Sequence, residues 1–291
     1  MAQRDGLLFE GEGTVDSERI IYTPSAFAKT SLLHLQEVGQ LKAKKRHTSS
    51  RRDLSSYLFF IVEEGSGTVE YGGERYRLAR NDCAFIDCQK SYAHSTDENL
   101  WKIRWVHFYG PNMSAIYDKY ISRGGKCCFE ARDAEAFYAI IRTLYALASS
   151  TDYVRDMRIH EKLSSLLVLL MEESGFELES GTEGKTAHLQ AVKDYLDSHY
   201  TEKITLDDLS ARFFINKYYL LEIFKRQYGM GVGQYLIHLR ITKSKGLLRF
   251  TDKTLDEISY ACGMNSPQYF SRMFKKIEGV SPSEYRKNWV K

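Results

Sequence analysis

The sequence predicts an α+β fold, in which an N-terminal β-barrel with two following helices precedes an all-α domain of two helix-turn-helix units joined by a long helix. Three observations predict this fold. Short apolar and aromatic runs separated by turn residues fill the stretch from Ser31 to Phe108. Two leucine-rich helical patterns follow as far as Glu173. The last hundred residues then carry one helix-pair pattern twice.

The chain has 291 residues, which is enough for two domains with separate cores. Between them, the stretch EESGFELESGTEGK has the Gly, Ser and Glu content of a flexible linker. The predicted segments are an N-terminal arm or edge strand at 1–30, the barrel at 31–130, a helical segment at 131–173, the linker at 174–186 and the all-α domain at 187–291.

Six runs in the first half have the length and composition of strands. Gly72-Gly73 separates two of them by two residues, which favours a tight hairpin. Many short strands with turns between them are typical of a small barrel or sandwich. The runs are 32–38, 57–62, 68–71, 74–78, 83–87 and 101–109.

Two helices are predicted after the barrel. Asp133 can cap the first, in which Phe137, Ile141 and Leu144 recur at helical spacing. The second runs from about residue 152 to 173 and is dense in leucine. So much leucine exceeds what one small barrel needs to cover it, which leaves apolar surface for a further contact. The alternative is that both helices simply pack on the barrel.

The C-terminal third contains an internal repeat. Thr205-Leu206-Asp207-Asp208-Leu209-Ser210 matches Thr254-Leu255-Asp256-Glu257-Ile258-Ser259, and the matches continue past a turn that is one residue longer in the second copy. In that copy Thr254 and Glu257 form a capping box, and Gly263 ends the helix. Ser266 as N-cap and Pro267 at the first helical position then start another helix.

The last of these helices has two different faces. Phe270, Phe274 and Ile277 form one buried stripe, whereas the opposite face carries amide, hydroxyl and basic groups. Two short helices joined by a tight turn, the second polar and basic on its free face, indicate a helix-turn-helix. The alternative is a pair of unrelated amphipathic helix pairs in a generic bundle.

These residues resemble those of the AraC/XylS family of transcription regulators, whose DNA-binding domain is two helix-turn-helix units joined by a long helix. The resemblance is carried by the residues from Ile258 to Gly263, by Tyr269 to Lys276 and by Gly279-Val280-Ser281-Pro282-Ser283-Glu284-Tyr285-Arg286. It implies a homodimer through the helical segment 131–173.

The barrel region resembles the cupin-like sensor domain of the same family. The matching residues are Gly65 to Gly73, Asn81-Asp82 and Trp101 to Phe108. The sequence departs from the family pattern where relatives carry a Pro-His pair before the tyrosine of a strand, because Ser91 precedes Tyr92 here and the histidine is His94. The resemblance implies a small-molecule effector.

The distribution of charge favours a nucleic-acid-binding role for the repeat domain, and the cysteines argue against a zinc site. From Thr186 onward there are 17 Lys and Arg against 11 Asp and Glu, whereas residues 1–185 hold 24 against 27. Basic charge on the repeat domain is what phosphate contact requires. The five cysteines lack zinc-type spacing, and we expect reduced thiols in the cytoplasm. No signal peptide is expected, and the longest apolar run, residues 166–171, is too short to cross a membrane.

A metal site in the barrel is not expected. Enzymatic cupins use a His-x-His pair with a carboxylate and a further histidine, whereas this sequence offers only His47 near the first position and His94 near the second. We therefore predict no metal and no cofactor, and interpret His107 as a structural histidine. Aromatic and polar groups at the barrel mouth would instead suit a sugar or another polyhydroxyl compound. The candidate ligand-binding residues are Arg52 (or its neighbour Arg51), Tyr57, Tyr92, His94, Trp101 and Trp105, with Arg104 as a further possibility.

Candidate DNA contacts follow from the helix-turn-helix geometry, in which early residues of the second helix meet base edges. Gln268 can pair with adenine and Arg272 with guanine. Leu221 and Glu222 are unexpected at the same positions of the first unit, so the second unit is expected to dominate sequence reading. The candidates are Lys217, Tyr218, Leu221, Glu222, Lys225 and Arg226 in the first unit, and Ser266, Pro267, Gln268, Ser271, Arg272 and Lys276 in the second.

Together these features predict a dimeric, cytoplasmic, ligand-responsive regulator that binds specific double-stranded promoter DNA. We expect an activator, which would also contact RNA polymerase, and no membrane partner. Two alternatives stay open at this point: a metal-dependent cupin enzyme fused to a DNA-binding domain, and a regulator whose barrel only dimerises.

Overall fold

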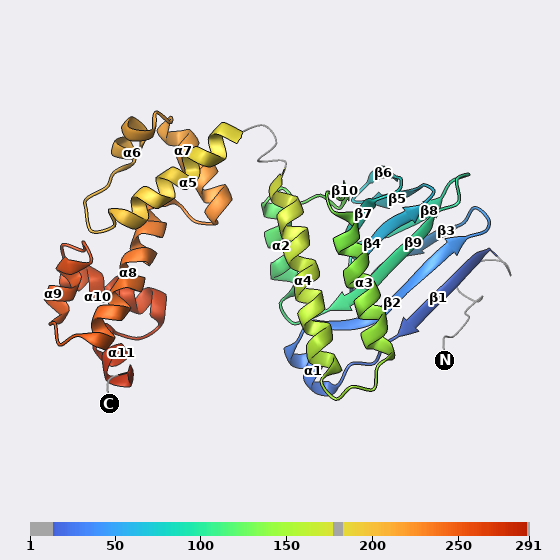
Figure 1. Ribbon diagram of the computed structural model, residues 1–291, viewed down its shortest axis with the longest axis horizontal. Helices are drawn as coiled ribbons and strands as arrows, with labels where there is room; N and C mark the ends of the chain where they lie inside the picture. The colour runs from blue at the N-terminus through green and yellow to red at the C-terminus, as the bar shows by residue number, and fades with distance from the viewer. Residues whose placement is uncertain (1–13, 177–182, 290–291) are drawn as a thin grey trace. The chain divides into compact units, whose positions relative to one another are not determined.

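The computed structural model describes residues 14–176 and 183–289. The chain forms two compact units, Met1–Glu177 and Leu178–Lys291 (Figure 1). The first combines two β-sheets with helices, and the regular elements among the described residues of the second are all helices. The predicted α+β fold is therefore confirmed.

Two antiparallel sheets form the barrel of the first unit. The larger has the strand order β1-β2-β9-β4-β7-β10 and the smaller has the order β3-β8-β5-β6. The Gly72-Gly73 hairpin joins β5 and β6, and both glycines have positive φ, as a primed turn requires. The strands are β1 Val15–Ile21, β2 His34–Ala43, β3 Thr48–Arg51, β4 Tyr57–Glu64, β5 Gly67–Tyr71, β6 Glu74–Leu78, β7 Asp82–Asp87, β8 Tyr92–Thr96, β9 Lys102–Tyr109 and β10 Cys128–Glu130.

The central strand β4 is buried on both faces, which explains why its sequence is a continuous apolar run rather than an alternating one. Phe59 and Ile61 belong to the core between the larger sheet and the helices. Leu58 and Phe60 belong to a second core, between the two sheets. Alternation along each strand therefore decides whether a side chain faces the helices or the barrel interior.

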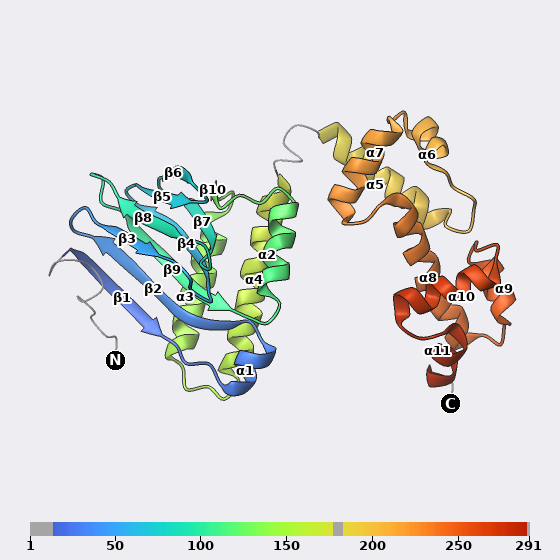
Figure 2. The ribbon, with the colours of Figure 1, turned by 180° about the vertical axis from the view of Figure 1, so that it is seen from behind.

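Helices cover one face of the larger sheet (Figures 1 and 2). Asp133 accepts a hydrogen bond from the Ala136 amide, so the predicted N-cap of the first long helix is confirmed. Leu163, Leu166 and Leu170 are buried within the same chain, against the sheet and the neighbouring helix. The leucine density is therefore explained by packing over the sheet and is no sign of a second copy. These helices are α1 Ala26–Ser31, α2 Met113–Ser122, α3 Ala134–Ser149 and α4 Arg155–Phe176.

The helical unit contains the predicted repeat. Both capping boxes are present, Thr205 with Asp208 and Thr254 with Glu257. Beyond each box a serine hydroxyl donates to a carbonyl in the turn: Ser210 to Ile215 and Ser259 to Met264. The helices are α5 Glu183–Ser198, α6 Leu206–Phe213, α7 Lys217–Tyr228, α8 Val232–Phe250, α9 Leu255–Ala261, α10 Pro267–Glu278 and α11 Pro282–Trp289.

The long helix α8 belongs to both copies. Its Arg240 donates to the carbonyls of Tyr200 and Glu202, which follow α5. In the same way Arg286 on α11 donates to the carbonyl of Leu248 in the last turn of α8 and to that of Lys253, which follows α8. Each copy also has its own hydrophobic core. The repeated structure is therefore a helix-turn-helix clamped between two flanking helices, and α8 is shared.

The two turns differ at one position. Gly263 has φ +74°, and the corresponding residue of the first unit, Phe214, has φ +53° with a side chain that is 95% exposed. A bulky residue in the left-handed region costs about 1–2 kcal/mol. Phe214→Gly is therefore expected to stabilise the protein by roughly 0.5–1 kcal/mol, after the loss of glycine's chain entropy.

Chemical denaturation of the full chain measures this effect. Phe214→Ala is the matched control, because it removes the exposed ring but keeps Cβ, and it should give no gain. Equal stabilisation by both substitutions would trace the effect to the ring and would contradict backbone strain.

The predicted arm and linker lie partly outside the described residues, namely at 1–13 and 177–182. Residues 15–21 form the edge strand β1. Helix α4 extends to Phe176 and α5 begins at Glu183, so both helices enter the predicted linker range. None of the described helices is both long and apolar enough to cross a membrane.

Candidate ligand cavity and DNA interface

The barrel encloses a cavity of about 240 Å³ between its two sheets. Aromatic, basic, acidic and hydroxyl side chains line it, contributed by strands that are far apart in the sequence. This volume is just below the roughly 300–1,000 Å³ of pockets for drug-sized ligands, which fits one small molecule. The lining residues are Arg19, Glu37, Leu41, Ser49, Arg51, Leu58, Phe60, Tyr92, His94, Ile103, Trp105 and His107.

Trp105 occupies the cavity wall because Gly39 leaves room for it. Gly39 lies between Arg19 and Trp105 in the β1-β2-β9 register. A Cβ at Gly39 would come within 2.8 Å of the indole ring. The Arg19 guanidinium lies 5.3 Å from the centre of the Trp105 ring. The glycine thus permits a cross-strand stack of an arginine and an indole.

Arg19 and Glu37 form a largely buried ion pair beside this indole. Arg19 donates to Glu37 Oε1 at 3.1 Å and to Ser17 Oγ at 3.0 Å. Burial raises the pKa of Glu37, and the charge of Arg19 opposes that shift. A fixed cation and carboxylate of this kind offer hydrogen-bond donors and acceptors to a polar ligand.

Two histidines complete the polar lining. Burial lowers the pKa of His94 to about 3 and that of His107 to about 4, so both are neutral at pH 7. His107 Nδ1 lies 2.9 Å from Ser56 Oγ, which agrees with the predicted hydrogen-bonded role, although the side chain also lines the cavity. His94 Nδ1 is buried and has no hydrogen-bond partner among the described residues. A neutral imidazole can donate or accept, so this nitrogen is available to a ligand.

Three of the predicted ligand-binding residues, Tyr92, His94 and Trp105, line the cavity. Tyr57 does not, and its expected role is corrected. It is the first residue of β4 and points to the helical side, where its ring lies 5.3 Å from that of Tyr117 on α2. Its neighbour Leu58 faces the cavity instead, because side chains alternate along the strand.

Trp101 and Arg52 also lie outside the cavity lining. Trp101 is fully buried behind His94, 5.8 Å between ring centres, and a Cβ at Gly67 would come within 2.4 Å of its ring. It therefore supports the wall and is not a contact surface. Arg52 is exposed and lines a shallow outer depression, whereas its neighbour Arg51 reaches both that depression and the cavity.

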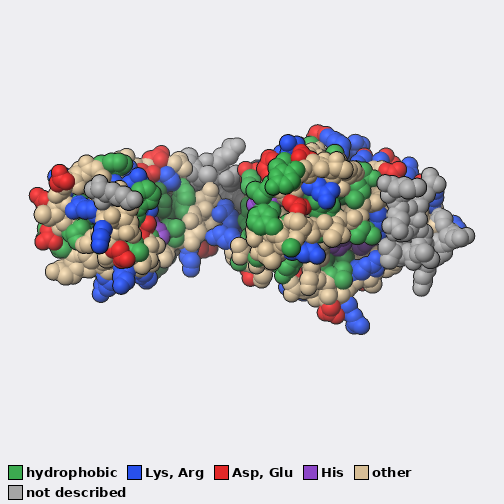
Figure 3. Space-filling view, turned by 90° about the horizontal axis from the view of Figure 1, so that it is seen from below, with side chains coloured by type: hydrophobic (Ala, Val, Ile, Leu, Met, Phe, Trp, Pro, Cys, Tyr) green, Lys and Arg blue, Asp and Glu red, His purple; other side chains and the backbone are tan. Residues whose placement is uncertain are grey.

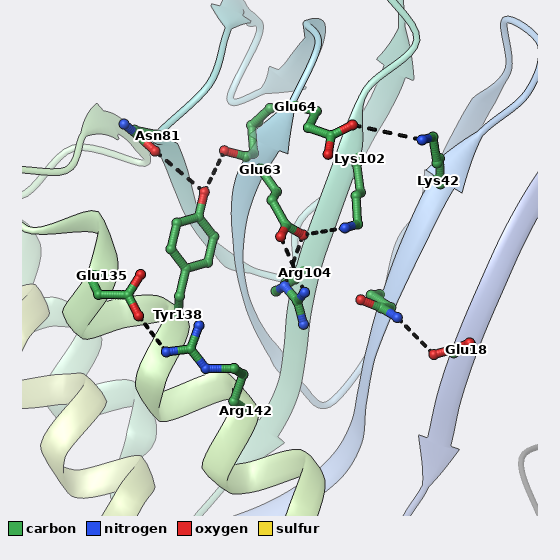
Figure 4. A network of polar contacts seen from close by, with 12 residues as sticks. Glu18, Lys42, Glu63, Glu64, Asn81, Lys102, Arg104, Glu135, Tyr138 and Arg142 are labelled. Atoms are coloured by element: carbon green, nitrogen blue, oxygen red, sulfur yellow. Dashed lines mark hydrogen bonds and ion pairs between the residues drawn. The ribbon is translucent and has the colours of Figure 1, made fainter.

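Arg104 belongs to a separate polar network (Figure 4). It donates to Glu63 at 2.9 Å, and Lys102 pairs with the same carboxylate at 3.1 Å. Tyr138 of α3, labelled in the same view, donates its hydroxyl to the carbonyl of Val62 at 2.9 Å. Arg104 therefore faces away from the cavity, although Trp105 beside it faces inward.

Arg19, Glu37 and Ser49 were not predicted as ligand contacts. Arg19 and Glu37 are 18 positions apart and meet only because β1 pairs with β2. The sequence signal for Arg19 and Glu37 as cavity residues is weak. Each is a charged residue within an otherwise strand-like segment, Arg19 next to Glu18 and Glu37 within residues 34–43.

The cavity does not have the donor set of a cupin metal centre. Among the described residues no group of three His, Cys, Asp or Glu side chains could hold a metal ion. His47 lies close enough to His94 to lower its pKa. The carboxylate that a metal centre would also need, that of Glu37, is already paired with Arg19. The residues present therefore suit an organic ligand better than a divalent metal.

Helix α10 of the second unit presents the predicted recognition face. Ser266 Oγ accepts from the Tyr269 amide and Pro267 follows as the first helical residue. Gln268, Arg272 and Lys276 are exposed, and Ser271 is half-buried between them. The Arg272 guanidinium lies 5.4 Å from the centre of the Tyr269 ring. None of the three exposed side chains forms an ion pair within the described residues, so the basic groups are available for a nucleic acid.

The first unit presents a different recognition face on α7. Lys217 pairs with Asp207 at 2.9 Å, and Arg226 approaches Glu222 at 4.0 Å. Leu221 is half-buried, whereas Tyr218 and Lys225 are exposed. Carboxylates thus offset two of the three cations on this face.

Lys and Arg side chains gather along one edge of the helical unit in Figure 3.

Comparison with known proteins agrees with both units. Residues 34–167 match the family described as AraC-like ligand binding domain, and residues 209–288 match the one described as helix-turn-helix domain. The HTH-type transcriptional regulator YisR of Bacillus subtilis is 36% identical over 272 residues, covering 86% of this chain and 92% of YisR. The Msm operon regulatory protein of Streptococcus mutans is 23% identical over 88% of this chain and 92% of its own length.

The lactose operon transcription activator of Staphylococcus xylosus is 26% identical over 78% of this chain and 82% of its own length. In each case the alignment spans both the barrel and the helical unit. Three observations agree: the barrel encloses a cavity, the helical unit holds two helix-turn-helix units, and the relatives are transcription regulators. The chain belongs to the AraC/XylS family and is a DNA-binding transcription regulator with a ligand-binding domain.

Proposed function

We propose that the cavity binds a sugar or a similar polyhydroxyl compound as effector, and that the bound effector makes the regulator an activator. One observation carries this proposal: the face of Trp105 lies beside the Arg19–Glu37 pair, with His94 and His107 on the same lining. A flat ring face with convergent donors and acceptors suits a ring of hydroxyl groups. The name of the lactose operon transcription activator supports both the sugar and the sign of regulation.

A thermal-shift screen of purified protein against pentoses, hexoses and disaccharides tests the proposal. A ligand at 100 times its dissociation constant adds about 2.7 kcal/mol to the stability of the state that binds it. A hit should shift the melting temperature in proportion to the logarithm of its concentration. A panel without any concentration-dependent shift would reject the sugar assignment and favour a barrel that only dimerises.

We assign the barrel a sensing rather than a catalytic role. The relatives are transcription regulators, and the polar groups that line the cavity include the Arg19–Glu37 ion pair and two neutral histidines. Ser56, whose hydroxyl lies 2.9 Å from His107 Nδ1, is not among the described residues that line the cavity, so it is not placed to attack a bound ligand. The proposed place of action is the cytoplasm, where an activator also meets RNA polymerase. All five cysteines are free thiols, as suits that compartment.

For DNA, we assign base reading mainly to the second unit. Gln268, Ser271 and Arg272 on α10 are the proposed base contacts, with Ser266, Pro267 and Lys276 at the backbone. On α7 we assign Lys217, Tyr218, Lys225 and Arg226 to backbone contacts, and Leu221 and Glu222 to the edge of the groove. Helix α8 has 19 residues and is about 28 Å long, which is close to the roughly 34 Å between successive major-groove turns.

The proposed homodimer contact is the outer face of α4, with Val154 just before it. Val154, Met157 and Val168 are exposed by 39%, 50% and 55%, and their spacing puts them on one side of the helix. The double substitution Met157→Lys and Val168→Lys should convert a dimer to a monomer, because two charges would be buried at the contact.

Sedimentation velocity measures the oligomeric state. Leu54→Lys changes an exposed leucine elsewhere on the same unit and serves as the control. A wild-type protein that stays monomeric at micromolar concentration, or a double variant that stays dimeric, would reject this face.

A further inference from the structure

The charged groups on the cavity wall do not balance. Arg19, Arg51 and Glu37 are the charged side chains among its described lining residues, so two cations face one carboxylate. Glu37 forms an ion pair with Arg19, with 3.1 Å between a guanidinium nitrogen and Oε1. The polar contact of Arg51 is a hydrogen bond from its guanidinium to the carbonyl of Ser50, at 2.9 Å. No ion pair joins Arg51 to a carboxylate among the described residues.

The position of Arg51 extends its reach beyond the cavity. It lies on β3 opposite Tyr92 of β8, and both residues also line the outer depression. Arg52 lines the depression beside them. The carboxylate in the depression, that of Glu70, is already engaged by Arg75. Half-buried Arg51 therefore lines both the depression and the cavity and forms no ion pair within the described residues. Its charge acts at longer range on Glu37, the carboxylate that Arg19 already binds.

The other polar groups do not supply the missing negative charge. His94 and His107 are neutral, and the charge of Arg51 contributes to lowering both of their pKa values. Tyr92 keeps its proton because burial raises its pKa. A partly buried guanidinium without a counterion is unfavourable, and a planar fork of N–H donors matches a carboxylate or phosphate.

We propose that the effector is an anionic polyhydroxyl compound, with its carboxylate or phosphate ester bound by Arg51 at the mouth and its hydroxyl groups bound in the cavity beside Trp105. This inference rests on the proposed sugar-binding function and adds the charge of the ligand. It also gives Arg52 a role as a second cation in the outer depression.

Matched ligand sets test the inference on the full-length protein. Each hexose of the panel is compared with its uronic acid and its 6-phosphate by isothermal titration calorimetry and thermal shift. The wild type should bind the anionic member at least tenfold more tightly than the neutral parent. The stronger of the two anionic arms identifies the group as carboxylate or phosphate.

Arg51→Gln should remove the preference, by weakening the anionic ligand at least tenfold while changing the affinity of the neutral parent less than twofold. Arg51→Lys keeps the charge and should retain part of the preference, which also guards against a folding defect in the glutamine variant. Arg77→Gln is the control for loss of a cation, because Arg77 lies on β6 outside both the cavity and the depression, with a 77% exposed side chain.

Each other outcome overturns the inference. Equal affinity for neutral and anionic members would reject it and leave the sugar assignment intact. A preference that survives Arg51→Gln would locate the anion elsewhere. Inorganic phosphate that shifts the melting temperature as much as the sugar phosphate would indicate an ion site without a sugar. No binding by any member would reject this inference and the sugar assignment together.

Discussion

Replacing Arg272 by Ala is expected to weaken binding to the specific operator at least tenfold and to leave the fold and the oligomeric state unchanged. Arg272 is exposed on α10, its guanidinium lies over the Tyr269 ring, and no carboxylate pairs with it among the described residues. A bidentate contact from arginine to guanine contributes about 1–3 kcal/mol of discrimination. Fluorescence anisotropy with operator and scrambled duplexes, at fixed salt, measures the loss.

The repeat supplies a matched control for this substitution. Glu222 occupies the position in the first unit that Arg272 occupies in the second, and it lies 4.0 Å from Arg226. Glu222→Ala removes a carboxylate from the DNA-facing side, so operator affinity should stay the same or increase slightly. An equal loss from both substitutions would contradict the assignment of base reading to the second unit. Unchanged affinity of Arg272→Ala would reject its role as a base contact.

Trp105→Ala is expected to abolish the effector-dependent rise in melting temperature. The indole is the largest side chain on the cavity wall, and Arg19 stacks over it. Removing the indole enlarges the cavity and takes away the ring against which the Arg19–Glu37 pair packs. A saturating effector that stabilises the wild type by about 2.7 kcal/mol should then have no measurable effect. Each variant is compared with its own unliganded melting temperature, because the substitution also lowers intrinsic stability.

Two controls separate ligand binding from folding. Trp105→Phe keeps a flat ring and should retain part of the shift. Operator binding without effector reports on the helical unit, which folds around its own cores, and should be unaffected by Trp105→Ala. A full effector shift in Trp105→Ala would show that the ligand binds outside this cavity.

Local signals predicted the helical unit well. The capping box at Thr254, its match at Thr205, the N-cap at Ser266 and the turn at Gly263 depend on residues no more than a few positions apart. Such contacts form wherever the local sequence is present, so the repeat could be aligned without coordinates. The strands β3 and β8 were missed because they are short and polar, and their pairing depends on distant partners.

The cavity shows where local signals stop. Tyr57 and Leu58 are adjacent and both apolar, yet only Leu58 faces the cavity. That outcome depends on which face of β4 is turned to the helices, and helices α3 and α4 that cover that face lie more than 70 positions later. A choice between two apolar neighbours cannot be made without this packing.

The sequence by itself determined that this chain is a regulator with two helix-turn-helix units, because caps, turn glycines and core spacing are short-range and occur twice. Only the tertiary structure decided what the sensor can bind. Arg19, Glu37, Arg51, His94 and Trp105 come from five strands of two sheets, and strand register alone brings them to one wall. Register follows from long-range pairing and from which faces are buried, so the charge of the cavity is a property of the folded barrel.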